Sequence, residues 1–117
     1  MTETLVAGRE LDALVAEKVM GHTVTWLATA ISPAQPHYVD RAIACGYLLV
    51  EYYSTDIGAA WQVVERMREL NYGIAISDGP AWSFAVAPND DAGDVTCELA
   101  DTLPLAICRA ALRAVAT

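Results

Sequence analysis

Hydrophobic positions recur every three or four residues in three separate stretches of the chain, which is the spacing of one helix face. The first stretch, residues 8–21, predicts an amphipathic helix that ends at Gly21, a residue suited to a left-handed cap. Its apolar stripe consists of Leu11, Leu14, Val15 and Val19.

A second helix is predicted over residues 53–70. Ser54 is expected to cap its free amides, and Asp56 in the first turn suits the positive end of the helix dipole. The expected buried stripe is Ile57, Trp61, Val64 and Met67, with Gln62, Glu65, Arg66 and Glu69 facing outward.

A third helix is predicted over residues 102–116, capped by Asp101 or Thr102 and carrying Pro104 in its first turn. Its expected buried stripe is Leu105, Cys108, Leu112 and Val115.

Alternating and branched residues predict strands at 22–30, 47–53, 73–77, 81–87 and 94–100. In the first of them, Val24, Trp26 and Ala28 share one face. Asp78-Gly79-Pro80 is a turn signal that joins the third and fourth strands as a hairpin. Residues 31–46 contain two prolines and predict an irregular excursion.

The resulting order is helix, two strands, helix, three strands, helix, which predicts the α+β class. We expect one domain over residues 1–117: an antiparallel β-sheet sandwiched between α-helices, an α-β-α sandwich with a short C-terminal helix. The length of 117 residues and the 55% hydrophobic content suffice for one real core and not for two.

Fifteen acidic residues against seven lysines and arginines give a formal net charge of −8. This balance argues against nucleic-acid polymers and anionic membranes as partners, because both require a broad basic face. A small anion remains possible, since one or two arginines hold a phosphate through short-range bidentate contacts.

The N-terminus is acidic and has no apolar stretch typical of a signal peptide, and no segment approaches the ~20 apolar residues of a membrane span. The three cysteines, Cys45, Cys97 and Cys108, form no metal-binding spacing and are expected to be reduced and mostly buried. These features predict a soluble intracellular protein.

No catalytic apparatus is visible, so we expect neither an enzyme nor a cofactor nor a metal site. His22 and His37 have no nucleophile nearby in sequence and are expected to be surface or structural residues. The acidic loop 89–94 could gather a hard cation but lacks the ligand spacing of a calcium loop, which favours a solvated turn.

The aromatic residues raise two alternatives. Trp61 is expected in the core because it lies on the apolar stripe of its helix. Trp82 and Phe84 share one face of a strand, where the core is the favoured location and stacking against a flat ligand is the alternative. Their position just before the loop at Pro88 keeps the second alternative open.

Arg109 and Arg113 lie one turn apart on the last helix, on a face with Ala106 and Ala116. A solvated face is the simplest interpretation of such a pair. However, no acidic residue sits at helical spacing to neutralise them, and like charges one turn apart are unfavourable by roughly 0.2–0.5 kcal/mol. An anion that bridges the two guanidinium groups would make this unfavourable arrangement favourable.

Three stretches, LVAEKVMG, YSTDIGAAWQVVERM and TLPLAICRAALRAV, together resemble the phage ABA sandwich domain family. The resemblance implies a β-sheet held between two long helices. It also implies the activity of the Thoeris anti-defence sponges: sequestration, without cleavage, of the cyclic ADP-ribose signal that bacterial TIR enzymes make. Some sponges also bind cyclic di- or trinucleotides.

The resemblance further implies which residues bind the ligand. The arginine pair of the sponges falls on Arg109 and Arg113, and their late aromatic and following asparagine fall nearest to Phe84 and Asn89, with Trp82 as the other aromatic. It implies a homo-oligomer, a dimer or higher such as a hexamer, located in the host bacterial cytoplasm. The mean hydropathy of +0.30 independently favours self-association.

Two other hypotheses stay open at this stage. A phage inhibitor could bind a basic host protein through an acidic surface, which would require carboxylates clustered on one face; here they are scattered along the sequence. A hydrolase of nucleotide signals would require a metal or a positioned base, and neither is visible.

Overall fold

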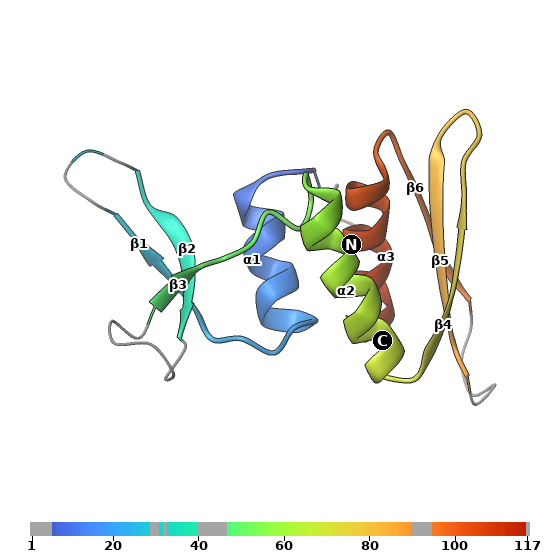
Figure 1. The fold of residues 1–117 in the computed structure, drawn as a ribbon, viewed down its shortest axis with the longest axis horizontal. Helices are drawn as coiled ribbons and strands as arrows, with labels where there is room; N and C mark the ends of the chain where they lie inside the picture. Colours follow the sequence, from blue (N-terminus) through green and yellow to red (C-terminus); the bar gives the residue numbers. More distant parts are fainter. Residues whose placement is uncertain (1–5, 29–30, 32, 40–46, 90–94, 117) are drawn as a thin grey trace.

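Three helices separate two small antiparallel sheets in the part of the chain that the computed structural model describes, residues 6–28, 31, 33–39, 47–89 and 95–116 (Figure 1). The elements, in order, are α1 (Arg9–Lys18), β1 (Val24–Leu27), β2 (Gln35–Val39), β3 (Tyr47–Leu49), α2 (Ile57–Glu69), β4 (Tyr72–Ser77), β5 (Trp82–Pro88), β6 (Thr96–Ala100) and α3 (Leu103–Ala116).

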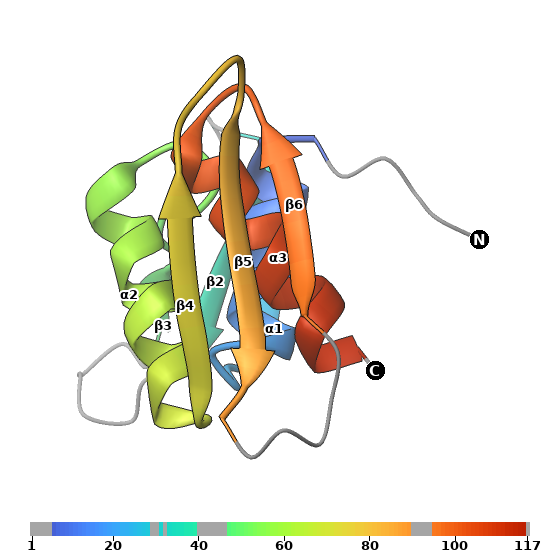
Figure 2. The same cartoon turned by 90° about the vertical axis from the view of Figure 1, so that its right-hand side faces the viewer.

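Each sheet is formed by strands that follow one another in sequence. The first sheet has the order β1-β2-β3, and the second has the order β4-β5-β6, with every neighbouring pair antiparallel. Figure 2 looks onto the second sheet, with β5 between β4 and β6. The hairpin predicted at Asp78-Gly79-Pro80 is confirmed, since Ser77 of β4 pairs with Ser83 of β5.

The α+β class, the antiparallel pairing and the C-terminal helix are confirmed. The layers differ from the expected single sheet between helices, because the strands divide into two sheets that lie on opposite sides of the helices (Figure 1). The helix α2 causes this division, since it carries the chain from the end of β3 to the start of β4. The C-terminal helix, expected to be short, has 14 residues and is the longest among the described elements.

Strand β2 lies within the segment that was expected to be irregular. Pro36 suggested a loop because proline cannot donate a hydrogen bond to a neighbouring strand. In the structure Pro36 is paired opposite Trp26, and its carbonyl oxygen accepts a hydrogen bond from the amide of Val50 at 2.9 Å. The proline therefore stays in the central strand by contributing an acceptor.

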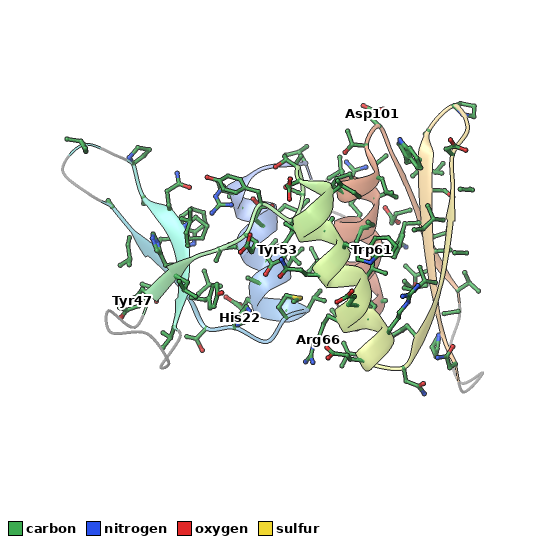
Figure 3. The ribbon with its side chains drawn as sticks, viewed as in Figure 1. His22, Tyr47, Tyr53, Trp61, Arg66 and Asp101 are labelled. Atoms are coloured by element: carbon green, nitrogen blue, oxygen red, sulfur yellow. The ribbon has the colours of Figure 1, made fainter. Side chains whose placement is uncertain are left out.

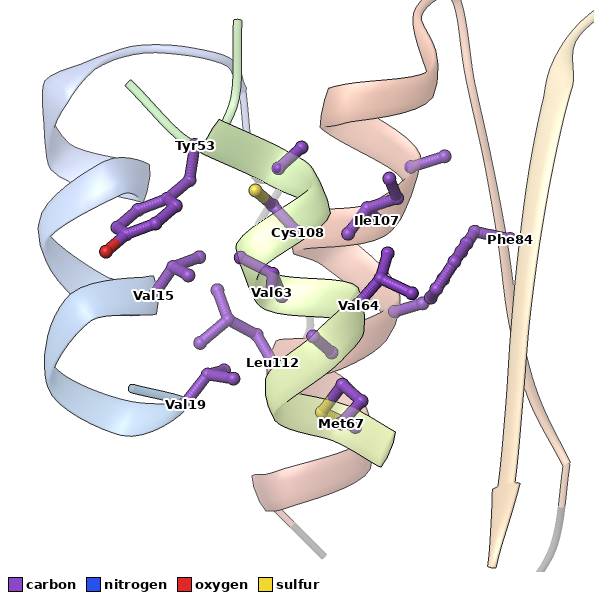
Figure 4. Packing of buried hydrophobic residues seen from close by; sticks show 14 of the residues in the cluster. Val15, Val19, Tyr53, Val63, Val64, Met67, Phe84, Ile107, Cys108 and Leu112 are labelled. Atoms are coloured by element: carbon purple, nitrogen blue, oxygen red, sulfur yellow. The ribbon is translucent and has the colours of Figure 1, made fainter. Parts of the chain in front are cut away.

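The hydrophobic core runs between the helices and continues to the inner face of the second sheet (Figure 4). Val15 and Val19 of α1 lie near Leu112 of α3, while Phe84 of β5 packs toward Val64 and Ile107 on the other side of the helices. The core thus joins all three helices.

The stripe predicted for α2 is partly wrong. Trp61 and Ile57 are exposed, by 38% and 50%, whereas Val63 is fully buried. Because α2 packs on both α3 and β4, its buried face is centred between the two neighbours and leaves Trp61 at the side. The guanidinium of Arg68 lies 5.9 Å from the centre of the Trp61 ring.

Of the three predicted helix caps, the one of α3 is confirmed. Gly21 has a φ of 78°, in the left-handed region that favours glycine, but α1 already ends at Lys18, with Val19 as its C-cap. Thr102 caps α3, its Oγ1 accepting from the amide of Leu105 at 3.4 Å. The cap of α2 is Asp56, whose carboxylate accepts from the amide of Ala59 at 2.8 Å, and not Ser54.

Candidate functional site

The two arginines of α3 both contact strand β6. Arg113 forms an ion pair with the carboxylate of Glu98, and Nη1 of Arg109 donates to the backbone carbonyl of Leu99 at 3.1 Å. Consecutive residues of one strand therefore hold the two guanidinium groups. The Arg113 side chain keeps 56% of its surface exposed, so it remains open to a solute.

Sequence reasoning missed Glu98, the counter-ion of Arg113. No acidic residue of α3 neutralises the arginines, as expected, but Glu98 approaches from a strand 15 residues earlier. One signal was present in the sequence: alternation along β6 turns Glu98 to the same face as Phe84, its partner in register. A carboxylate on the inner face of a sheet requires a cationic partner.

The alanine-lined surface expected around the arginines is not found. Ala106 is fully buried, and so is Ala110, because α3 packs against α1, α2 and the second sheet at once. The side chain of Ala116 lies outside the described residues. The exposed apolar neighbour on the β6 side is Leu99 instead.

The aromatic residues of β5 face inward. Phe84 is completely buried in the core, so its ring offers no surface to a ligand. Trp82 is half-buried and packs against the core, opposite Ala100 of β6 in register. Of the two, only Trp82 is partly exposed, and its partner in register, Ala100, follows Leu99, the residue whose carbonyl Arg109 contacts.

Asn89 lies at the opposite end of β5. Its amide nitrogen Nδ2 donates to Oδ1 of Asn71 at 3.2 Å, and its backbone amide donates to the Asn71 carbonyl at 3.0 Å. The five residues from Phe84 to Asn89 span about 17 Å along an antiparallel strand. The structure therefore does not bring Asn89 together with the arginine pair, and Asn89 closes the turn between α2 and β4.

The histidines have structural surroundings. The His22 ring stacks on Tyr38 with ring centres 4.1 Å apart, and Nδ1 of His37 lies 2.9 Å from the carbonyl oxygen of Gln35. Most of the acidic loop, residues 90–94, falls outside the described part. Within that part, no group of three or more metal-binding side chains occurs, and no helix has the length and apolarity to cross a membrane.

Of the cysteines, Cys108 is buried between the helices and Cys97 is exposed on the second sheet, while Cys45 lies outside the described residues. Burial raises the pKa of the Cys108 thiol. Burial, followed by the charge of Glu51, also raises the pKa of Tyr53 to about 12. Both groups thus stay protonated in the folded protein at neutral pH.

A buried polar cluster formed by Arg9, Asp12 and Ser54 was not anticipated from the sequence. The fully buried Asp12 carboxylate accepts from Nη1 of Arg9 at 2.9 Å, from the Ser54 amide at 2.8 Å and from Ser54 Oγ at 2.7 Å. Arg9 also donates to the carbonyl of Val50 at 2.6 Å and lies 3.9 Å from the Tyr52 ring centre. These hydrogen bonds connect the start of α1 to the segment between β3 and α2, which indicates a structural role for the cluster.

These features define a small α+β domain with two antiparallel sheets and an arginine pair at the edge of one of them. Comparison with known protein families matches residues 13–112 to the phage ABA sandwich domain, and the chain belongs to this family. Its fold is similar to the crystal structure of a phage protein from Bacillus cereus ATCC 14579, with 25% identity and a TM-score of 0.70 over 96% of this chain and 94% of that chain. No match was found among curated proteins.

Proposed function

We propose that this protein is a phage anti-defence protein that binds and sequesters a cyclic ADP-ribose immune signal without cleaving it. The observation that carries the proposal is the placement of Arg109 and Arg113, both directed to β6, in a member of the phage ABA sandwich domain family. The Thoeris sponges that the sequence resembles use an arginine pair at this spacing.

Two guanidinium groups suit the diphosphate of such a signal, because each offers planar N–H donors to phosphate oxygens. The ligand must displace the Glu98 carboxylate from Arg113. Each hydrogen bond between a guanidinium group and a charged phosphate oxygen contributes about 1.5–3 kcal/mol. A diphosphate that contacts both arginines gains at least two such bonds, which offsets the loss of the single pair between Arg113 and the largely covered Glu98.

Trp82 is the aromatic candidate for a contact with the base, since its ring is half-buried beside Ala100 at the strand that holds the arginines. Phe84 and Asn89 are left out of the proposed contacts, because the first is buried and the second lies at the far end of β5. The chain itself supplies all the proposed contacts, with no metal or cofactor.

The proposal includes three further elements that follow from the resemblance. The protein would act in the host bacterial cytoplasm, would bind cyclic di- or trinucleotides in addition to the cyclic ADP-ribose signal, and would assemble as a homo-oligomer. No nucleic-acid polymer or membrane is proposed as a partner, in view of the net charge of −8.

The test is capture of the signal. The protein is incubated with the product of a TIR enzyme, unbound nucleotide is removed, the protein is heat-denatured, and the released compound is identified by mass. Release of the intact signal supports a sponge, and a cleaved product identifies an enzyme. Arg68→Ala serves as the matched control for Arg113→Ala, since Arg68 is an exposed arginine on α2, away from β6.

If no nucleotide is carried, the alternative of an inhibitor that binds a host protein through its acidic surface becomes the favoured account. Association with a basic host protein that weakens steeply with salt would then be expected.

A further inference from the structure

Strand β4 leaves one side of its backbone without a partner strand in the part of the chain that the structure describes. In the order β4-β5-β6 it is an outer strand, and Figure 2 shows it at the edge of the sheet beside α2. The other outer strand, β6, is partly covered, because the guanidinium of Arg109 donates to the carbonyl of Leu99. Strand β4, with the sequence YGIAIS, contains neither a charged residue nor a proline, which are common protections of a strand edge.

The register shows which backbone groups of β4 face the free edge. The amide of Asn89 donates to the carbonyl of Asn71 at 3.0 Å, so these two residues form a hydrogen-bonded pair at the start of β4. Hydrogen-bonded pairs alternate along antiparallel strands, so the odd-numbered residues of β4 bond to β5. The amides and carbonyls of Tyr72, Ile74 and Ile76 therefore point away from β5, where an added strand would meet them.

Helix α2 runs beside this edge. It packs on β4 and is joined to it by a short turn, so the two elements run in opposite directions (Figure 1). The helical rise between Trp61 and the turn is about 14 Å, and the strand rise between the turn and Ile76 is also about 14 Å. Trp61 and Ile76 therefore lie at the same level, with Trp61 on the side of α2 that faces the second sheet (Figure 3). Ile57 lies one turn beyond Trp61 on the same side of α2.

These apolar side chains are open to solvent. Ile57, Trp61 and Ile76 are exposed by 50%, 38% and 38%. We refer to these three residues, Arg68 and the outward backbone of β4 as the β4 edge site. An unpaired strand edge beside exposed apolar side chains suits an extended peptide, because the edge supplies main-chain hydrogen bonds and the side chains select alternate residues of the peptide.

Arg68 gives the β4 edge site a positive charge. Its side chain is exposed, and its guanidinium lies 5.9 Å from the centre of the Trp61 ring. Among the described residues no carboxylate forms an ion pair with Arg68, although the chain as a whole carries −8. A carboxylate on a bound peptide would complement this charge.

We propose that β4 binds an extended segment of a partner protein as an added antiparallel strand, which continues the pairing of the second sheet. The side chains opposite Ile76, Ile74 and Tyr72 then point to the same face of the sheet as these residues, toward α2. Read from its N-terminal side, the segment meets the apolar residues of α2 first and Arg68 last. The segment that fits has two apolar residues and then an acidic residue at alternate positions.

This inference goes beyond the proposed function and does not rest on it. The β4 edge site and the arginine pair lie at opposite edges of the second sheet, with β5 between them. Recognition is by strand pairing and one cation, which also separates it from an inhibitor that binds a basic protein through an acidic surface. Peptide binding and nucleotide capture can each fail while the other holds.

The probe is a synthetic peptide blocked at both ends, Thr-Val-Thr-Val-Thr-Glu-Thr, whose β-branched residues favour an extended chain. Two-dimensional ¹H–¹⁵N NMR of the full chain follows the amides of Tyr72, Ile74 and Ile76 and the indole N–H of Trp61 during titration. We expect these signals to shift together with a Kd below about 500 μM. No shift at about 1 mM peptide, or shifts centred on another element, would overturn the proposal.

Modified peptides test the backbone pairing. In the proposed register the amides of the two valines and the glutamate face β4, and those of the threonines face solvent. N-methylation of the first set should abolish binding, and N-methylation of the threonines should leave it. The scrambled peptide Thr-Thr-Val-Val-Glu-Thr-Thr, of equal composition and charge, should not bind. Equal binding by both methylated peptides, or by the scrambled one, contradicts strand addition.

Arg68→Glu tests the charge. Lys18→Glu is the matched control, because it makes the same charge reversal in the last turn of α1. We expect Arg68→Glu to weaken binding about three- to tenfold and Lys18→Glu to change it by less than about twofold. A peptide with lysine in place of glutamate should recover binding to Arg68→Glu. Equal loss in the two variants, or none in Arg68→Glu, would refute the role of Arg68.

Two further measurements complete the design. If the spectrum of Arg68→Glu shows that it does not fold, a peptide with glutamine in place of glutamate gives the same comparison on the unchanged protein. A dilution series without peptide tests whether a second copy of the chain occupies the edge instead. Amide signals of β4 that shift with protein concentration alone would overturn the assignment of this edge to a partner segment.

Discussion

Arg113 of α3 and Glu98 of β6 form an ion pair that joins the last helix to the edge strand of the second sheet. Glu98 is largely covered, with 18% of its side chain exposed, while Arg113 is more open at 56%. The carboxylate therefore orients the guanidinium without enclosing it. An incoming anion competes with Glu98 for the same N–H donors.

This competition predicts the effect of Glu98→Gln. If Arg113 binds the phosphates of a cyclic ADP-ribose signal, loss of the competing charge should raise the affinity about three- to tenfold, or about 0.7–1.4 kcal/mol. Calorimetric titration of the wild type and Glu98→Gln measures this difference. An unchanged or weaker affinity in the variant would indicate that Arg113 serves only to hold α3 against β6.

Asp12→Ala should destabilise the fold strongly. The change leaves the Arg9 guanidinium without its carboxylate and the buried Ser54 amide without its acceptor. Breaking a buried pair by removing one partner costs about 3–5 kcal/mol. Urea unfolding measures the loss, with Glu10→Ala as the control, since the exposed Glu10 should change stability by less than about 0.5 kcal/mol. Equal effects of the two substitutions would refute the structural role of Asp12.

Alkaline pH should destabilise the protein through Tyr53. The pKa of Tyr53 is raised from 10.0 to about 12, so between these values the folded state keeps a proton that the unfolded state releases. Stability is complete below pH 10 and falls as pH rises toward 12, by up to about 2–3 kcal/mol. Unfolding in urea at pH 8, 10 and 11 follows this decline.

Tyr53→Phe separates this contribution from others. The phenylalanine keeps the ring but has no proton to release, so the decline should be shallower than in the wild type. Part of it should remain, because burial also raises the pKa of the Cys108 thiol. Identical pH dependence in the two proteins would contradict the assignment to Tyr53.

The helices were predictable from sequence because their signals are local. The cap of α3 by Thr102 and the buried positions Leu11, Val15 and Val19 of the first stripe depend on residues within one or two turns, whereas Leu14, predicted on the same stripe, is 38% exposed. The cap of α2 was misassigned because Ser54 forms its hydrogen bonds with Asp12 and Gly8, more than 40 residues earlier. Ser54 therefore does not cap α2, because its hydroxyl is engaged in hydrogen bonds with residues distant in sequence.

The division into two sheets was beyond sequence reasoning for a related reason. Alternation in a strand predicts an inner and an outer face, but it does not specify the partner strand. Because of Pro36, the segment that forms β2, the central strand of the first sheet, was predicted to be irregular. Without β2, too few strands remained at the N-terminal end for a sheet of its own.

The candidate site was predicted in part. Helical spacing correctly placed Arg109 and Arg113 on one side of α3, where both reach β6. The surroundings were not predictable, since Glu98 comes from another element and Phe84 is buried by helices that pack on the sheet. Whether the pair binds nucleotide stays a prediction.

The central claim is that Arg109 and Arg113 bind the phosphates of a cyclic ADP-ribose signal, and calorimetry on purified Arg109→Ala and Arg113→Ala tests it most directly. Both arginines contact β6 at the surface of the molecule, so alanine should change the free energy of unfolding by no more than about 1 kcal/mol. Lysine at either position should restore affinity only in part, since it lacks the planar fork. The account predicts a ten- to hundredfold loss of affinity in each alanine variant, about 1.5–3 kcal/mol, and no loss in Arg68→Ala. Wild-type affinity in both Arg109→Ala and Arg113→Ala would contradict it.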